Sequence, residues 1–178
     1  FNFLEELSLQ WLAEMCGLES MQGIYSSGGS VANLIALGGA RQSAFESIGH
    51  DPAADGINRP VRIYASEQSH HTIARSGGVL GIGRNAIKPI ACDDEGRMRI
   101  DDLQRALTED KASGILPMAI VANAGTTNTG AIDPLLSIGQ IARENAIWFH
   151  IDGAYGLPGI LDERISHLYK GLELADSV

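Results

Sequence analysis

Asp152 is the residue of this sequence best suited to chemistry, because it ends a strongly apolar run, residues 147–151. The run has the near-continuous apolar character of a parallel strand that is covered on both faces. A carboxylate at the end of such a strand is costly to remove from water, so we expect a cation, a metal ion or a hydrogen-bonding network opposite it. His150 lies two residues earlier, and the alternation of side chains along a strand places it on the same face.

A second chemical signal is the sequence Gly28, Gly29, Ser30, which comes just before a predicted helix. Glycine allows the backbone to approach a ligand closely, the helix N-terminus offers free N–H groups, and Ser30 adds a hydroxyl. Together these groups could bind a phosphate. The same residues could equally form a simple turn in which Ser30 caps the helix.

Two further polar clusters follow predicted strands. In residues 66–71, the adjacent side chains of His70 and His71 point in different directions on any helix, so we do not expect them to share a metal ion. One of them could lie flat over a planar ring, although a histidine near a helix start is more often a cap or a surface residue. Residues 123–130 carry hydroxyls that could hold the polar edge of a ligand, or that could satisfy each other within a turn.

These clusters require elements that bring them together, and the apolar periodicity of the chain predicts such elements. Strands and helices alternate, which favours an α/β fold with a mainly parallel sheet and helices on both faces. In open sheets of this kind, ligands bind beyond the carboxyl ends of the strands, where the polar clusters are expected. We predict helices over residues 4–16, 31–48, 72–80, 101–111 and 134–144, and strands over residues 61–65, 86–91, 117–122 and 147–151.

Smaller signals mark the ends of these elements. The apolar residues of the first helix recur at helical spacing, which indicates a helix packed on the core. Gly17 follows it, and glycine commonly ends a helix. Asp133 and Pro134 have the residue types of the cap and first turn of the last helix. Residues 49–60 are the segment that we expect to be loosest.

The composition excludes some classes of function. A formal net charge of −9, with no dense run of lysine or arginine, argues against partners such as nucleic acid or an anionic membrane surface. No apolar run is long enough to span a membrane. The two cysteines, Cys16 and Cys92, have neither metal-ligand spacing nor a disulfide framework, which favours small buried side chains and a cytoplasmic location.

The four clusters, taken in order, suit one kind of ligand. They offer a phosphate site, a partner for a planar ring, a pair of hydroxyls and a carboxylate. Pyridoxal phosphate has a phosphate, a flat aromatic ring, a phenolic oxygen and a basic ring nitrogen. Asp152 would keep that nitrogen protonated, so that the ring could accept the electrons released when a bond to the α-carbon of the substrate breaks.

The chain closely resembles the group II pyridoxal-phosphate-dependent amino-acid decarboxylases, the family of aromatic-amino-acid, histidine and glutamate decarboxylases. The resemblance runs through nearly all 178 residues. It implies that residues 1–178 are part of the large, cofactor-binding domain of the type I, aspartate aminotransferase-like fold of pyridoxal-phosphate enzymes, which works as a homodimer. The motifs that carry the resemblance are residues 26–33, 66–70, 124–127 and 150–155.

The resemblance also implies roles for individual residues. It assigns a phosphate loop, a histidine that stacks on the pyridine ring, a threonine near the polar edge of the cofactor, a carboxylate partner for the ring nitrogen and a small residue that packs on the ring. His70 and Asp152 would be the catalytic residues. In this sequence the implied residues are Gly28, Gly29 and Ser30 for the phosphate, His70 for stacking, Thr127 for the polar edge, Asp152 for the nitrogen and Ala154 for packing.

Some features of the family are not found in this sequence. The cofactor-anchoring lysine of the family follows a histidine on the strand after the Asp152 segment, whereas this chain ends at Val178, just as a strand would start. We therefore expect a fragment of a longer protein that is inactive by itself. Lys170 resembles a residue at a helix end and is expected to be solvated. Gly153 replaces an alanine that is common in the family, and Tyr155 resembles the aromatic-substrate branch.

The predicted function is decarboxylation of an L-amino acid to an amine and carbon dioxide. The alternatives are a carbon–carbon lyase that resembles sphingosine phosphate lyase, an aminotransferase, or a non-catalytic protein that has kept the fold. A nicotinamide-binding domain is disfavoured, because the glycines of residues 77–83 have the wrong spacing and follow a helix pattern instead of opening one.

Overall fold

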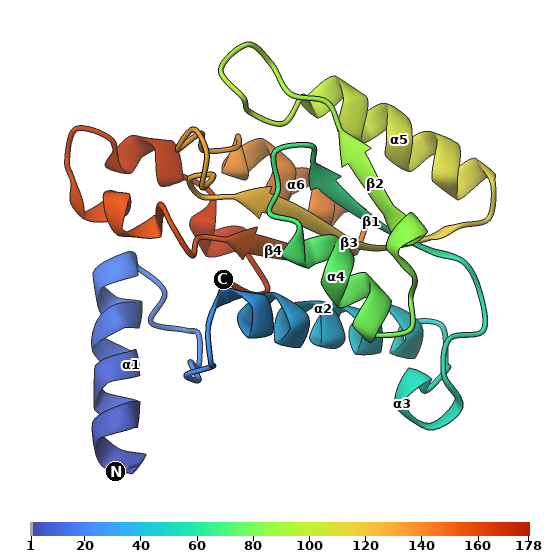
Figure 1. The fold of residues 1–178 in the computed structure, drawn as a ribbon, viewed down its shortest axis with the longest axis horizontal. Coiled ribbons are helices and arrows are strands. Elements are labelled where there is room, and N and C mark those ends of the chain that lie inside the picture. The colour runs from blue at the N-terminus through green and yellow to red at the C-terminus, as the bar shows by residue number, and fades with distance from the viewer. Residues whose placement is uncertain (1) are drawn as a thin grey trace.

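Four parallel strands form the central sheet of the computed structural model, which describes residues 2–178 (Figure 1). The strand order is β2-β1-β3-β4, and every neighbouring pair is parallel. The four predicted strands are thereby confirmed, with ends that shift by a few residues at most. The strands are β1 (Val61–Ser66), β2 (Ile87–Ile90), β3 (Leu116–Asn123) and β4 (Trp148–Asp152).

Helices cover both faces of the sheet, as predicted (Figure 1). One face carries α2 (Gly29–Glu46) and α4 (Thr72–Val79), and the other carries α5 (Ile100–Ala112) and α6 (Leu135–Glu144). Successive side chains of β3 point to opposite faces, so Ile120 belongs to the core under α5 and α6, and Val121 to the core under α2. Burial on both faces explains why the strands are apolar throughout.

The strand order creates a natural place for a ligand. The chain moves outward from β1 to β2 and then returns to β3 on the opposite side of β1. The loops that follow β1 and β3 therefore lead away from each other, which leaves a crevice at the carboxyl ends of these strands. Beyond β4, Ser177 forms a parallel bridge with His150, so the end of the chain runs beside β4 as a further strand would.

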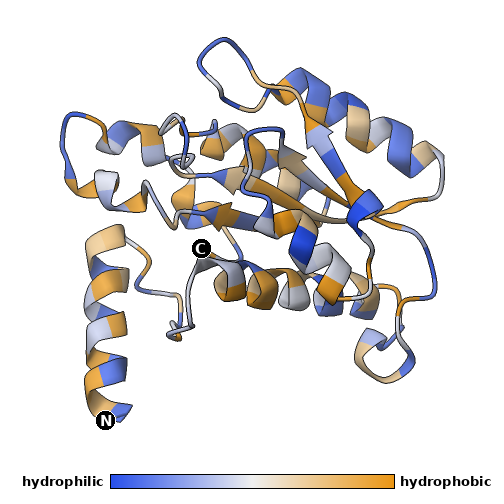
Figure 2. Cartoon of the chain, in the orientation of Figure 1, coloured by the Kyte–Doolittle hydropathy of each residue, from blue (hydrophilic) through white to orange (hydrophobic). Residues whose placement is uncertain are grey.

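Helix α1 (Asn2–Cys16) forms where a helix is predicted, but the prediction that it packs on the core is wrong for most of its length. None of its residues is buried, and the Trp11 side chain is 56% exposed. Ala13 and Cys16 near its end pack against the core. Figures 1 and 2 show that α1 stands to one side of the sheet, with apolar residues along its length.

Asp133 does not cap α6, contrary to the prediction. The residue before α6 is Pro134, and no side chain caps that helix. The Asp133 carboxylate is instead only 1% exposed and accepts backbone N–H groups of Met98 at 2.6 Å and Asn123 at 2.7 Å. Burial raises the pKa of the Asp133 carboxyl. Three hydrogen bonds, the third from the Asn123 side chain, explain why a carboxylate is retained there.

Other segments add short helices that the sequence did not predict. Residues 49–60 contain α3 (Pro52–Asp55), which the Asp51 side chain caps by accepting the Ala53 N–H group. Three short 3-10 helices follow β4, namely Leu157–Leu161, Ser166–Tyr169 and Leu172–Leu174. Lys170 is exposed between the last two, in agreement with the prediction that it is solvated. Among residues 2–178, no helix is both long and apolar enough to cross a membrane.

Candidate active site

The four polar clusters meet in one pocket of about 190 Å³ at the carboxyl ends of the strands. It lies where the strand order predicts a crevice, between the loop after β1 and the loops after β3 and β4. The N-terminus of α2 closes its remaining side. The residues that line it are Gly29, Ser30, Asn33, Gln68, His70, Thr72, Asn123, Gly125, Thr126, Thr127, Asp152, Ala154 and Tyr155.

Gly29 and Ser30 are the first two residues of α2 and face the pocket. The first N–H groups of a helix have no acceptor within it, so they are available to an anion, which the helix dipole also favours. Ser30 does not cap α2, since the cap residue is Gly28 with φ 132° and no side-chain cap bond. Gly28 itself lies just outside the pocket lining and sets the path of the chain into the helix.

A close approach explains the glycine at position 29. A Cβ atom built on Gly29 would lie 3.3 Å from the Cβ atom of Ala154, in the loop after β4. Ala154 is exposed and lines the pocket from that side. Larger residues at either position would separate the start of α2 from the loop that carries Asp152.

Asp152 is partly buried, at the end of β4, and no cation faces it among the described residues. Its Oδ2 atom accepts the Asn33 amide at 3.0 Å, and its Oδ1 atom accepts the N–H group of Ala154 at 3.2 Å. Of the three partners that the sequence left open, the structure shows a hydrogen-bonding network. A carboxylate oxygen has more than one lone pair, so each remains able to accept a donor in the pocket.

His150 lies on the same side of β4 as Asp152, as the strand alternation predicts, and both contact Asn33. The His150 ring is 3% exposed, with Nε2 at 2.8 Å from the Asn33 carbonyl oxygen and Nδ1 at 3.0 Å from the Ser177 hydroxyl. Burial lowers the pKa of His150, although the nearby Asp152 carboxylate and the Ser177 backbone act in the opposite direction. The ring is therefore neutral in the folded protein near pH 7.

This lowered pKa predicts acid-sensitive stability. Above the usual histidine pKa of about 6.5, His150 is neutral in both the folded and unfolded states. As the pH falls through that value, the unfolded chain takes up a proton that folded His150 does not, so stability is lost by up to about 1.4 kcal/mol per pH unit. Thermal unfolding of the full-length polypeptide that contains this chain, between pH 7.5 and 5.5, measures the loss.

The control for this pH effect is the exposed residue His167. We expect His150→Asn to flatten the dependence of unfolding temperature on pH, and His167→Asn to leave it as in the wild type. An equally steep dependence in the His150→Asn variant would mean that other groups cause the acid sensitivity.

His70 is exposed in the pocket, and Thr72 fixes its ring orientation. The His70 Nδ1 atom lies 2.9 Å from the Thr72 hydroxyl and 3.4 Å from the Thr72 backbone N–H group. Because two donors face Nδ1, that atom acts as an acceptor, and the neutral ring carries its proton at Nε2. The ring of His71 lies against it, with 4.1 Å between the centroids. The contacts with Thr72 and His71 thus hold the His70 ring at the pocket.

Thr126 and Thr127, which follow β3, have different roles in the structure. Thr126 is buried, and its hydroxyl bonds that of Thr129 at 2.7 Å, so it serves the turn itself. Thr127 is exposed and lines the pocket. Of these two hydroxyls, Thr127 is therefore the one available to a ligand.

The loops after β3 and β4 are held together by direct backbone contact. A Cβ atom built on Gly125 would lie 2.6 Å from the Cα atom of Gly156, so only glycine allows this approach. The Tyr169 hydroxyl donates to the Gly156 carbonyl oxygen. These contacts fix Thr127 and Ala154, which belong to the two loops, on either side of the pocket.

The whole chain, residues 1–178, matches the pyridoxal-dependent decarboxylase conserved domain. The chain belongs to this family. This confirms the family resemblance and, with it, pyridoxal phosphate as the cofactor of the family. The residues present fit that group, since one pocket combines a free helix N-terminus, an exposed histidine ring and a carboxylate with unused lone pairs.

Relatives of this decarboxylase-family chain agree with the assignment. An aromatic-L-amino-acid decarboxylase of Bacillus atrophaeus is 36% identical over 98% of this chain, and a cysteine sulfinic acid decarboxylase of Mus musculus is 32% identical over 100% of it. The chain spans 35% and 36% of the lengths of these relatives.

A solved structure supports the fold of this decarboxylase-family chain directly. The glutamate decarboxylase domain of diaminobutyrate-pyruvate transaminase and L-2,4-diaminobutyrate decarboxylase from Vibrio parahaemolyticus has a TM-score of 0.93 and 35% identity. The match covers 98% of this chain and 39% of that one. The fold is thus the predicted type I fold of pyridoxal-phosphate enzymes.

Sequence reasoning about this decarboxylase-family chain gave no role to three residues that organise the site. They are Asn33, Thr72 and Asn123, all less than 5% exposed. Asn123 accounts for the position of the loop after β1, because its side chain donates to the Ser69 hydroxyl at 3.2 Å and to Asp133 at 3.0 Å. A polar residue inside an apolar helix or strand could have indicated such a role, because polar side chains are usually buried only where they have hydrogen-bond partners.

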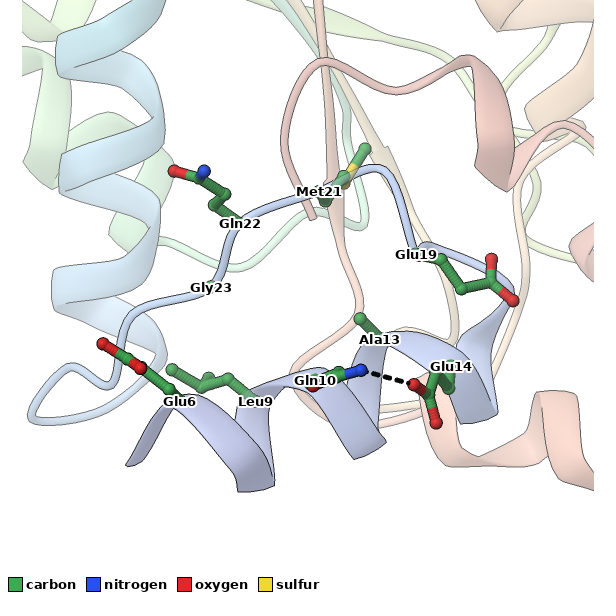
Figure 3. A pocket seen from close by; sticks show the side chains of 9 residues that line it. All are labelled: Glu6, Leu9, Gln10, Ala13, Glu14, Glu19, Met21, Gln22 and Gly23. Carbon is green, nitrogen blue, oxygen red and sulfur yellow. Dashed lines mark hydrogen bonds between the residues drawn. The ribbon is translucent and has the colours of Figure 1, made fainter. Parts of the chain in front are cut away.

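A larger cavity, of about 460 Å³, lies away from this site, between α1 and residues 19–23 (Figure 3). Its lining includes Glu6, Glu14 and Glu19, and none of the residues that the sequence singled out. Within residues 2–178, no three His, Cys, Asp or Glu side chains are grouped so that they could hold a metal ion. The pocket of about 190 Å³ is the candidate active site, because it gathers the four polar clusters.

Proposed function

We propose that the full-length polypeptide containing this chain decarboxylates an L-amino acid to an amine and carbon dioxide. The observation that carries the proposal is the pocket itself, in which the N-terminus of α2, the His70 ring and the Asp152 carboxylate converge. The names of the three relatives described above support it, since all three contain the word decarboxylase. Those relatives act by name on different amino acids, so the proposal extends to an amino acid and not to a particular one.

Each residue of the pocket has a proposed task toward the cofactor. Gly29 and Ser30 bind the phosphate through N–H groups and a hydroxyl, with Gly28 shaping the loop. Asp152 pairs with the ring nitrogen and holds its proton. When bound, pyridoxal phosphate supplies a ring that accepts the electron pair left by the departing carboxylate. The residues proposed to enclose the ring are His70 and Ala154 on its faces and Thr127 at its polar edge.

The products of the reaction separate this proposal from its alternatives. A decarboxylase releases carbon dioxide and an amine, a carbon–carbon lyase releases an aldehyde, and an aminotransferase releases a keto acid. The full-length polypeptide is therefore incubated with pyridoxal phosphate and a panel of L-amino acids, and all three product classes are measured. Carbon dioxide and amine in equal amounts support the proposal, whereas an aldehyde or keto acid without carbon dioxide would replace it.

The anchoring lysine is proposed to lie outside these 178 residues. No lysine is among the residues that line the pocket, and Lys170 is exposed. Borohydride reduction of the cofactor-loaded full-length polypeptide, followed by peptide mapping, should label a lysine beyond Val178. A label on Lys88, Lys111 or Lys170 would contradict the placement of the cofactor in this pocket.

We also propose that the full-length polypeptide is a homodimer located in the cytoplasm. The apolar side chains on α1 support an interface, since Leu4, Trp11 and Met15 are 65%, 56% and 50% exposed. Sedimentation of the full-length polypeptide tests the dimer. For the location, the support is that Cys16 and Cys92 are both free thiols.

The proposed stacking role of His70 makes a specific prediction about cofactor binding. His70→Ala removes a ring that contributes about 1 kcal/mol by stacking, so the dissociation constant for pyridoxal phosphate should rise about fivefold. Fluorescence titration of the apo protein measures this constant. His167→Ala, which removes an exposed ring outside the pocket lining, is the control and should change it less than twofold. Equal effects of the two substitutions would argue against stacking by His70.

A further inference from the structure

Asn33 links two site residues that come from different parts of the chain. Its amide nitrogen lies 3.0 Å from Asp152 Oδ2 and 3.1 Å from the Thr72 hydroxyl, which in turn lies 2.9 Å from His70 Nδ1. Its carbonyl oxygen lies 2.8 Å from His150 Nε2. The side chains of Asp152 and His70 are thus connected through one amide on α2.

The donors and acceptors in this network permit one direction only. A carboxylate only accepts, so the Asn33 amino group must face Asp152, and its second N–H donates to Thr72. The Thr72 hydroxyl then donates to His70. On the other side, the Trp148 indole donates to the Ser177 hydroxyl at 2.9 Å. His150 Nδ1 lies 3.0 Å from that hydroxyl, which donates to the neutral ring, and 3.2 Å from the Ser177 carbonyl oxygen. The His150 Nε2–H group finally donates to the Asn33 carbonyl oxygen.

The Asn33 amide is therefore fixed on three sides. Asn33 is 4% exposed and lies one turn inside α2, on the helix face that Gly29 begins. Both N–H groups and the carbonyl oxygen have partners, and each partner is itself held by β4 or by the start of α4. A buried amide with all its partners present holds a single orientation, because any rotation leaves a buried polar atom unpaired.

We propose that Asn33 is the positioning residue of the cofactor site, which sets the plane of the Asp152 carboxylate and, through Thr72, the orientation of the His70 ring. This inference rests on the proposed function. The two groups that must meet the same planar ring come from β4 and from the loop after β1, and the Asn33 network connects them directly. Asn33 has no reaction to perform, and its effect is on geometry alone.

The test compares three substitutions in the full-length polypeptide. Asn33→Leu removes the amide and nearly preserves the side-chain volume. Thr72→Val removes only the hydroxyl that leads to His70. The matched control is Gln42→Leu, which also removes an amide from α2 but whose partners are Glu46 and Asp51, outside the site. Fluorescence titration gives the dissociation constant for pyridoxal phosphate, and visible circular dichroism reports how the bound ring is oriented.

We expect Asn33→Leu to raise the dissociation constant about 10- to 100-fold, as loss of a buried hydrogen bond to a charged group predicts, and to change the visible dichroic band. Thr72→Val should raise the constant about as much as His70→Ala and should change the band as well. The Gln42→Leu variant should bind pyridoxal phosphate with the affinity of the wild type and show the same visible dichroic band. If Asn33→Leu does not fold, Asn33→Ser, which keeps one hydroxyl donor, takes its place and should give a smaller rise with the same change of band.

The possible outcomes separate this inference from the proposed function. If the wild type binds the cofactor and the Asn33 and Thr72 variants match Gln42→Leu in both affinity and dichroism, the positioning role is wrong while the proposed function stands. If affinity falls but the dichroic band is unchanged, Asn33 supports binding without orienting the ring, and the inference is also wrong. If the wild type does not bind pyridoxal phosphate, the proposed function and the inference both fail.

Discussion

Replacing Asp152 by alanine should lower kcat of the full-length polypeptide about a thousandfold with cofactor at saturation. The carboxylate is proposed to hold the proton on the ring nitrogen, and that proton lets the ring accept the electrons of the breaking bond. Removing one preorganised electrostatic group of this kind costs about 2.7–4 kcal/mol, or about 100- to 1000-fold in rate. Asp152 is the one carboxylate among the described residues that line the pocket, so no other lining side chain can take its place.

The control for this substitution is Asp162→Ala. Asp162 follows a 3-10 helix after β4 and bonds the exposed side chain of Arg164, away from the pocket. Its loss should leave kcat within about twofold of the wild type, as for most surface substitutions. Near-normal turnover of Asp152→Ala would remove the basis for assigning the site.

Gly125→Ala should destabilise the folded protein by about 3 kcal/mol. The new Cβ atom would lie 2.6 Å from the Cα atom of Gly156, a backbone atom of the neighbouring loop after β4. Overpacking of this kind costs about 1–3 kcal/mol. The φ angle of Gly125 is +95°, and a side chain in left-handed backbone adds about 1–2 kcal/mol.

Gly130→Ala is the matched control for this substitution. Gly130 belongs to the same loop and has φ +71°, but a Cβ atom there meets nothing within 4 Å. It should therefore carry only the conformational cost, about 1–2 kcal/mol. Thermal unfolding of the full-length polypeptide compares the two variants, and Gly125→Ala should melt several degrees below Gly130→Ala. Equal melting temperatures would show that the two loops separate easily and do not hold the pocket.

The fold could be predicted well wherever the pattern of apolar residues decides it. The strands are apolar throughout because helices cover both faces, and this signal located β1 to β4. The helical spacing of α1 was also informative, but spacing alone cannot say what covers the apolar side of a helix. For that reason α1 was expected on the core, whereas Trp11 lies largely exposed.

The site could be predicted as a set of clusters but not as a network. The place of each cluster after a strand or before a helix is readable from the sequence, and the topology brings all four to one pocket. The partners of Asp152 could not be read in this way. Asn33 precedes it by 119 positions, and the contact depends on how α2 packs on β4. The buried position of Asp133 could not be predicted for a similar reason. One of its hydrogen-bond donors, the backbone N–H group of Met98, lies 35 residues away in the sequence.

If this pocket holds pyridoxal phosphate, a crystal structure of the full-length polypeptide with the cofactor will show the cofactor there. We expect the phosphate at the N–H groups of Gly29 and Ser30, the ring nitrogen within hydrogen-bond distance of Asp152, and the His70 ring on one face of the cofactor. Cofactor density elsewhere in the protein, or a ring nitrogen that faces away from Asp152, would contradict this expectation.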